Sequence, residues 1–211
     1  VEGGLADGRA AAPLGRRRRI FRRVRTEAER IDLGRGGFGG APKFPPHSVI
    51  DFLLAQAEEG YRDLALDTLR AMAAGGIHDQ LGGGFSRYSV DERWHIPHFE
   101  KMLYDNALLA RNYLHAWQCT GDDAFATVCR STLDWMLVEM LPEMHGPSGG
   151  FASGLDADSL DATGHSEEGA FYGWQKDEFV EVVGAVAPDH LEALLAYWGV
   201  IDDGEFEGAN V

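Results

Sequence analysis

Apolar residues recur every three or four positions in four stretches of the chain, a spacing that is typical of helices with one buried face. Glycines end the first two stretches, and Pro97 suits the first turn of the third, where its missing N–H goes unused. The predicted helices span residues 49–60, 63–76, about 97–118 and about 123–141. The chain is therefore expected to be all-α and built from helical hairpins.

Long glycine-rich loops separate these helices. Residues 34–47 hold five glycines and three prolines, which excludes a helix or a central strand. The tripeptide Gly-Gly-Phe recurs at 36–38, 83–85 and 149–151, so we expect the long connections to gather on one side, with each Phe anchoring its loop. Beyond these loops the pattern predicts a strand at 170–174 and short helices at 176–184 and 189–199.

Composition narrows the class of protein. The chain has 211 residues, 45% of them hydrophobic, which suits one globular domain. No apolar run approaches the roughly 20 residues that span a bilayer, so no membrane partner is expected. Cys119 and Cys129 match neither a CxxC redox pair nor a zinc site, and two buried reduced thiols agree with a cytoplasmic location.

The net charge of −15 is unevenly distributed along the chain. Residues 1–35 contain ten Arg and five acidic residues, whereas residues 36–211 contain nine Lys or Arg and 29 acidic residues. We expect the Arg-rich residues 1–35 to be a poorly ordered flank and 36–211 to be the folded domain; an arm that binds nucleic acid or an anionic surface is the alternative. The acidic body argues against nucleic acid as a partner.

Four motifs resemble a large family, the thioredoxin-domain-containing proteins related to the spermatogenesis-associated protein of animals. They are GGFGGAPKFP (36–45), GGIHDQLGGGFSRYSVDERWHIPHFEKMLYDNALL (75–109), GGFASGLDADS (149–159) and EEGAFYGW (167–174). The resemblance implies a thioredoxin-like domain followed by an (α/α) toroid of the six-hairpin glycosidase type, similar to that of N-acylglucosamine 2-epimerases.

This sequence departs from that family pattern in ways that affect the expected architecture. The thioredoxin-like domain and its cysteines are absent, the Arg-rich flank looks unlike the family, and the final GEFEGANV looks like the start of a further motif. Four long helices make two hairpins, so we expect a fragment that forms a partial toroid. Its open hairpin edges would expose apolar residues, which predicts a homo-oligomer.

The strongest candidate for chemistry is the polar stretch 79–106. A helix that begins near Pro97 would place His98 and Glu100 in its first turn, where His98 is suited to acid–base catalysis near neutral pH. Helix capping and an i, i+4 pair of Lys101 with Asp105 are the structural alternative. The expected substrate-binding residues are Asp79, Gln80, Arg87, Tyr88, Trp94, Tyr104 and Asn106, the last within the apolar stripe, where its amide must find backbone partners.

A second candidate is the acidic loop that contains Asp156 and Asp158, together with Asp161, Glu167 and Glu168. Close carboxylates act as acid and base or bind a hard cation, but an EF-hand loop needs Gly where Asp161 stands, so no metal is predicted. Loop capping is the alternative. The absence of P-loop and HExxH patterns removes P-loop nucleotide binding and zincin chemistry, and no cofactor is expected.

Two functional hypotheses remain open. The first is a domain that binds a carbohydrate and acts as a sugar epimerase, isomerase or glycoside hydrolase, with His98, Glu100, Asp156 and Asp158 as the acid–base set. The second is a non-catalytic interaction or scaffold domain of a thioredoxin-domain-containing protein. Convergence of His98, Asp79 and Asp156 on one pocket would favour the first, and side chains used up as backbone caps would favour the second.

Overall fold

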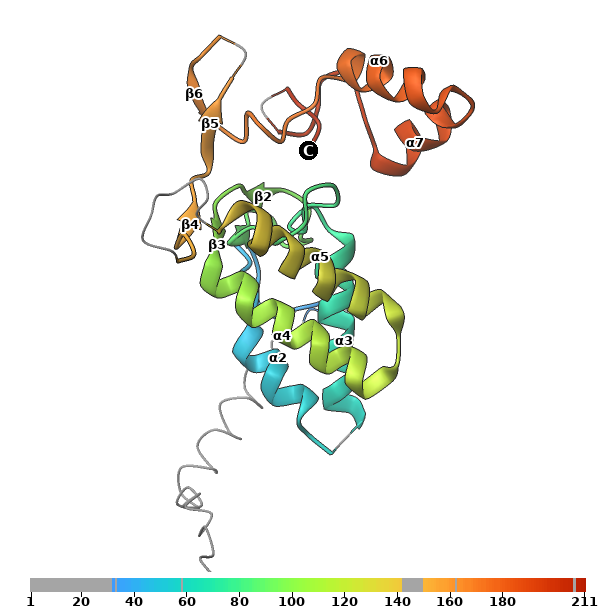
Figure 1. Cartoon of the computed structure of the whole chain (residues 1–211). Helices are drawn as coiled ribbons and strands as arrows, with labels where there is room; N and C mark the ends of the chain where they lie inside the picture. Colours follow the sequence, from blue (N-terminus) through green and yellow to red (C-terminus); the bar gives the residue numbers. More distant parts are fainter. Residues whose placement is uncertain (1–31, 33, 58, 142–149, 162, 207) are drawn as a thin grey trace, which may run out of the picture.

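Four helices pack together in a computed structural model that describes residues 32, 34–57, 59–141, 150–161, 163–206 and 208–211 (Figure 1). Most of the predicted Arg-rich flank, residues 1–31 and 33, lies outside the described residues. The helices are α2 (His47–Leu54), α3 (Glu59–Ala74), α4 (Leu103–Thr120) and α5 (Asp123–Glu139). Helix α4 packs against α5 and α2, and α2 also packs against α3.

The α4–α5 hairpin follows directly from its turn residues. Gly121 adopts the left-handed conformation with φ 72°, and its N–H donates to the carbonyl of Trp117 at 2.7 Å. Asp122 then caps α5, because its carboxylate accepts a hydrogen bond from the N–H of Ala124. The predicted turn and fourth helix are confirmed.

The core lies between these helices and is formed by the apolar faces that the periodicity identified. Tyr113 is fully buried, and its hydroxyl donates to the carbonyl of Leu69 at 2.8 Å, which joins α4 to α3. The other large buried side chains of the four helices include Ile50, Leu53, Leu69, Met72, Leu109, Phe125, Trp135 and Met136. Within the described residues, no helix is long and apolar enough to cross a membrane.

The predicted start of the third helix at Pro97 is wrong. Residues 97–102 are extended: β2 (Pro97–His98) pairs with β1 (Tyr88–Ser89), and β3 (Lys101–Met102) pairs with β4 (Gly154–Leu155), all antiparallel. The backbone N–H of Leu103 donates to the carbonyl of Ser153, and only then does α4 begin. Hydrogen bonds to distant segments therefore override the local helical pattern.

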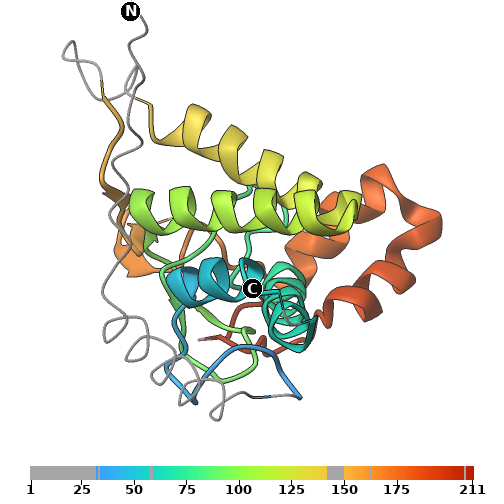
Figure 2. The ribbon, with the colours of Figure 1, turned by 90° about the horizontal axis from the view of Figure 1, so that it is seen from below.

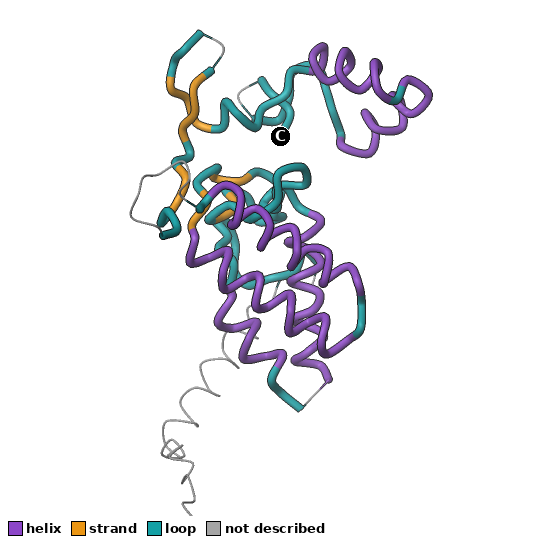
Figure 3. The backbone as a smooth tube through the Cα atoms, in the orientation of Figure 1, coloured by secondary structure: helices purple, strands orange, loops and turns teal. Residues whose placement is uncertain are grey.

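The remaining elements lie at the end of the helices opposite the α2–α3 connection, where the short strand pairs gather (Figures 1 and 3). They are the hairpin β5 (Asp158–Leu160) and β6 (Ser166–Glu168), helix α6 (Lys176–Val186), the 3₁₀ turn η1 (Pro188–His190) and helix α7 (Leu191–Trp198). The two short helices are confirmed. The α6–α7 pair stands to one side of the four helices (Figure 2).

The predicted strand at 170–174 is wrong. Gly169 turns the chain with φ 73°, and its carbonyl accepts hydrogen bonds from the N–H groups of Tyr172 and Gly173. Within this segment only Trp174 pairs, as an isolated bridge with Asn210. The turn instead brings Tyr172 onto Phe99, with ring centroids 5.2 Å apart, and this contact attaches the C-terminal part to the loops.

The Gly-Gly-Phe repeat has a clear physical basis in its first two copies. Gly36, Gly37, Gly83 and Gly84 all have positive φ, and a Cβ at Gly37 or Gly84 would lie 2.6 Å from a tryptophan ring. These rings belong to Trp94 and Trp135, and a buried lysine sits over each at about 5 Å, Lys43 and Lys101 respectively. The third copy includes Gly149, which lies outside the described residues.

Candidate functional site

His98 lies between two carboxylates contributed by different parts of the chain. Its Nδ1 atom is 2.6 Å from Glu168 Oε1, and its Nε2 atom is 3.9 Å from Glu100 Oε2. Glu100 in turn accepts a hydrogen bond from Arg87 Nη1 at 2.7 Å. The ring of Tyr88 stacks on the imidazole with centroids 4.7 Å apart. We call His98, Glu100, Glu168, Arg87 and Tyr88 the His98 cluster.

Strand pairing sets this geometry. Tyr88 and His98 are register partners in the β1–β2 pair, so their side chains share one face. The carbonyl of Glu100 accepts a hydrogen bond from the N–H of Arg87, which holds the next outward residue beside the same pair. Glu168 arrives from β6, where it lies opposite Asp158 across the hairpin. Glu168, a member of the predicted acidic loop, thus contacts His98 of the predicted polar stretch.

The His98 cluster remains open to solvent. The His98 side chain is 24% exposed, and those of Glu100, Glu168 and Arg87 are more exposed still. Glu100, by its hydrogen bond and its charge, raises the pKa of Arg87. A carboxylate on Nδ1 favours the tautomer that carries its proton there, which leaves the Nε2 lone pair to accept a proton. The arrangement is suited to proton transfer at Nε2.

Asp79 and Gln80 have structural partners in this conformation. The Asp79 carboxylate caps the turn at Leu81 and Gly82 and accepts a hydrogen bond from Lys101 Nζ at 2.8 Å. Burial favours the neutral acid, but the Lys101 charge and these hydrogen bonds prevail and hold the pKa of Asp79 below its usual value. Gln80 donates to the carbonyls of Ala73, Gly75 and His78. Neither residue lies in the His98 cluster.

Lys101 does not pair with Asp105 as the helical spacing predicted. Because residue 101 lies in a strand, its side chain points inward, is 1% exposed and binds Asp79 and the carbonyl of Gly83. Burial lowers the pKa of Lys101, against the opposing charge of Asp79. Asp105 instead meets His47, with Oδ1 3.2 Å from Nε2.

The structure also separates the aromatic and amide candidates. Trp94 is fully buried, and its Nε1–H donates to the carbonyl of Gly36, so its ring offers no surface to a ligand here. Tyr104 is half exposed in the first turn of α4, where its side chain interacts with Arg87 of the His98 cluster. Asn106 is completely buried and hydrogen-bonds both backbone groups of Phe85, which confirms the expected backbone partners.

Asp156 and Asp158 do not enter the His98 cluster. Asp156 is exposed and accepts a hydrogen bond from the N–H of Asp158, an Asx turn that starts β5. Asp161 likewise accepts hydrogen bonds from the N–H groups of Thr163 and His165. Sequence reasoning placed Glu168 in the acidic loop but not beside His98, and only the hairpin register brings the two together. In the described part of the chain, no three His, Cys, Asp or Glu side chains are grouped as a metal site requires.

Comparison with known proteins gives relatives and a fold. No protein-family model matches the chain. It is 39% identical over 208 residues to spermatogenesis-associated protein 20 of Mus musculus, and 38% identical to the Homo sapiens protein of that name. An uncharacterised protein of Caenorhabditis elegans is 38% identical over 211 residues. The matches cover 87–92% of this chain but only 26–28% of those relatives.

Solved structures identify the architecture. The cellobiose 2-epimerase of Spirochaeta thermophila superposes with a TM-score of 0.51 at 13% identity, and that of Bacillus thermoamylovorans with 0.52 at 12%. The matches cover 89% and 87% of this chain and 54% of each epimerase chain. The fold is a partial (α/α) toroid. The predicted fold class is confirmed, and the partial toroid carries the His98 cluster on its loop side, where the strand pairs gather (Figure 1).

Proposed function

We propose that this partial toroid is a carbohydrate-active domain in which His98 transfers a proton to or from a sugar, as in epimerisation, isomerisation or glycoside hydrolysis. The observation that carries the proposal is the imidazole held by Glu168 at 2.6 Å on Nδ1, with Glu100 near Nε2. A histidine oriented by a carboxylate is a common general base near neutral pH.

The surroundings of His98 support a sugar as the ligand. Tyr88 stacks on the imidazole, and Phe44, whose ring lies 4.8 Å from that of Tyr88, is 53% exposed. Sugar rings present C–H faces to such aromatic surfaces and hydroxyls to groups such as Arg87 and Glu100. The solved neighbours are sugar epimerases, but a shared fold does not imply a shared reaction. The proposal therefore depends on the pair of His98 and Glu168.

The direct test is exchange of a sugar C2 proton with solvent deuterium, followed by NMR for glucose, mannose and cellobiose. We expect slow exchange with the unaltered chain, loss of exchange in His98→Gln, and a decrease of about 10- to 100-fold in Glu168→Gln, which removes the orienting charge. His165→Gln, in the same hairpin, is the matched control because its side chain is exposed.

Glycoside hydrolysis is tested in parallel with aryl glycosides, and sugar binding with thermal shifts. If no sugar exchanges, is cleaved or shifts the melting temperature, the carbohydrate-active proposal is wrong. If activity is present but equal in His98→Gln, the domain retains its proposed class and His98 loses its role.

A second candidate function is association through the α6–α7 surface. These helices contain no buried residue, and Val186 and Tyr197 are 82% and 81% exposed. Large apolar side chains exposed in this way are typical of an interface. We propose a second copy of the chain as the occupant, because an exposed apolar face can be buried against the same face of another copy in a two-fold dimer.

Sedimentation equilibrium tests this second candidate. We expect a concentration-dependent dimer that Tyr197→Glu with Val186→Glu dissociates, while Leu160→Glu on β5, also highly exposed, leaves it intact. A monomer over the whole concentration range, with cooperative melting, would refute self-association.

A further inference from the structure

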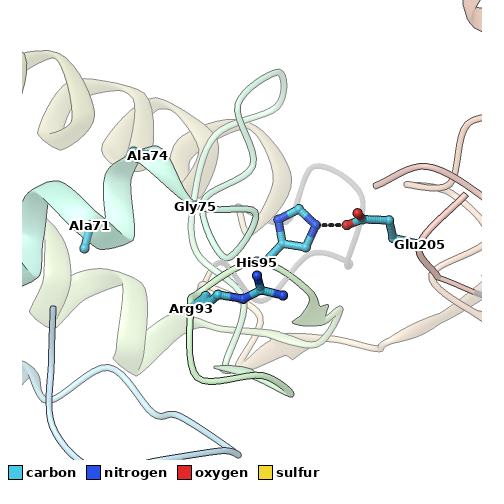
Figure 4. A pocket seen from close by; sticks show the side chains of 6 residues that line it. All are labelled: Ala71, Ala74, Gly75, Arg93, His95 and Glu205. Atoms are coloured by element: carbon cyan, nitrogen blue, oxygen red, sulfur yellow. Dashed lines mark hydrogen bonds and ion pairs between the residues drawn. The ribbon is translucent and has the colours of Figure 1, made fainter. Parts of the chain in front are cut away.

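A cavity separate from the His98 cluster opens between the C-terminal end of α3 and the loop that precedes β2 (Figure 4). Its volume is about 360 Å³, within the range of small-molecule sites. Ala71, Ala74 and Gly75 form one wall, and Arg93, His95 and Glu205 form the rest.

The loop that carries Arg93 and His95 is held rigidly. The carboxylate of Asp91 accepts hydrogen bonds from the backbone N–H groups of Arg93, His95 and Ile96, at 2.5, 3.1 and 2.6 Å. Between them, Trp94 adopts φ 66°, which is rare for a bulky residue, and buries its ring completely. Such strain persists only where the surroundings fix the backbone. Arg93 and His95 are therefore presented on a preformed loop.

Of the charged side chains in the cavity, His95 and Glu205 contact each other and Arg93 stands apart. The Nε2 atom of His95 contacts Glu205 Oε2, and Figure 4 shows this pair across the opening with the Arg93 guanidinium beside the imidazole. Among the described residues, no carboxylate forms an ion pair with Arg93. The cavity thus offers one guanidinium without a counter-ion, next to a His–Glu pair that is able to donate and accept hydrogen bonds.

We propose that this cavity binds a small hydroxylated monocarboxylate, of the chemical class of the uronic acids. The guanidinium fork matches a carboxylate with two parallel hydrogen bonds. His95 and Glu205 bind hydroxyl groups, and the Ala71–Ala74 wall accepts a C–H face. A phosphate dianion fits less well, because Glu205 and the net charge of −15 repel a second negative charge more strongly.

NMR titration of the chain with D-glucuronate, D-glucose and inorganic phosphate tests the inference. We expect glucuronate to bind in the millimolar range and to perturb the His95 ring, with glucose at least about tenfold weaker because it cannot pair with Arg93. Arg93→Gln should weaken glucuronate binding about tenfold or more. The matched control is Arg130→Gln, which removes the same charge from the exposed surface of α5 and should change binding less than about twofold.

Three outcomes overturn the inference: no perturbation by glucuronate up to about 50 mM, equal weakening by Arg93→Gln and Arg130→Gln, or phosphate binding as tightly as glucuronate. Far-UV circular dichroism confirms that each variant is folded, as expected for exposed residues. Binding in this cavity is read from the His95 ring and proton transfer from exchange of the sugar C2 proton, so failure of the proposed proton transfer and failure of this site are distinguishable.

Discussion

Removing the buried cation at Lys101 should destabilise the domain by leaving Asp79 without its partner. In Lys101→Met the stem is replaced by an apolar chain of similar length, while Asp79 stays largely buried. Removing one partner of a buried pair typically costs about 3–5 kcal/mol. Asp79 keeps its hydrogen bonds from Leu81 and Gly82, so we expect a value near the lower end, about 3 kcal/mol.

Urea denaturation followed by tryptophan fluorescence measures this loss. With a slope of about 2 kcal/mol per molar urea, the midpoint should fall by about 1.5 M. The double variant Asp79→Asn with Lys101→Met should recover part of the loss, because no uncompensated charge remains.

The same variant carries a pH signature. The pKa of Asp79 is depressed in the folded protein, so the stability it contributes is present above the usual value of 3.8 and is lost as pH falls through the folded pKa. Lys101→Met removes the charge that depresses this pKa. The difference in unfolding free energy between the unaltered chain and Lys101→Met should therefore shrink below about pH 4. Equal midpoints at pH 7, or a gap that acid leaves unchanged, would refute the reasoning.

Two further predictions concern buried polar and backbone features, and both are read from urea midpoints. Asn106→Leu should lower the free energy of unfolding by about 2–5 kcal/mol, because the backbone N–H and C=O of Phe85 lose their partners. Asn112→Leu should be neutral or stabilising, since both buried amide atoms of Asn112 lack partners among the described residues. Similar losses of stability in the two variants would contradict this reasoning. Gly84→Ala should lower the free energy of unfolding by more than about 2 kcal/mol, because φ is 77° and the new Cβ would lie 2.6 Å from the indole ring of Trp135. Gly39→Ala has the same φ but open space around the new Cβ, so it should lower the free energy of unfolding by about 1 kcal/mol. Equal effects would show that the close approach at Gly84 is unimportant.

The long helices could be predicted because their signals are local. Periodic apolar positions, Gly121 after α4 and Asp122 before α5 together specify that hairpin. The extended segment 97–102 could not, because Phe99, Met102 and Leu103 also fit a helical stripe. Its strand pattern is an alternation in which Pro97, Phe99 and Lys101 are buried, and a lysine at an inward position disguises it.

The candidate site divides in the same way. A buried Asn106 that binds nearby backbone follows from its place in an apolar stripe. The contact of His98 with Glu168 spans 70 residues and depends on two strand registers and a hairpin, none of which a local pattern reveals. Asp156 and Asp158 belong to the same acidic segment, but Asp156 forms the turn that starts β5. It is Glu168, on the other strand of the hairpin, that contacts His98.

The buried Lys101 and the partly exposed His98 are coupled because they lie on opposite faces of one extended segment. Phe99 and Lys101 point inward while His98 and Glu100 point outward. Shifting the segment by one residue would exchange the two faces, bringing His98 toward Asp79 and Phe99 into solvent. Lys101 is the residue in this segment that hydrogen-bonds both Asp79 and the carbonyl of Gly83. The ion pair of Lys101 with Asp79 therefore favours the register that presents His98 to Glu168. Weakening this ion pair should disturb the contact of His98 with Glu168 before the helices unfold.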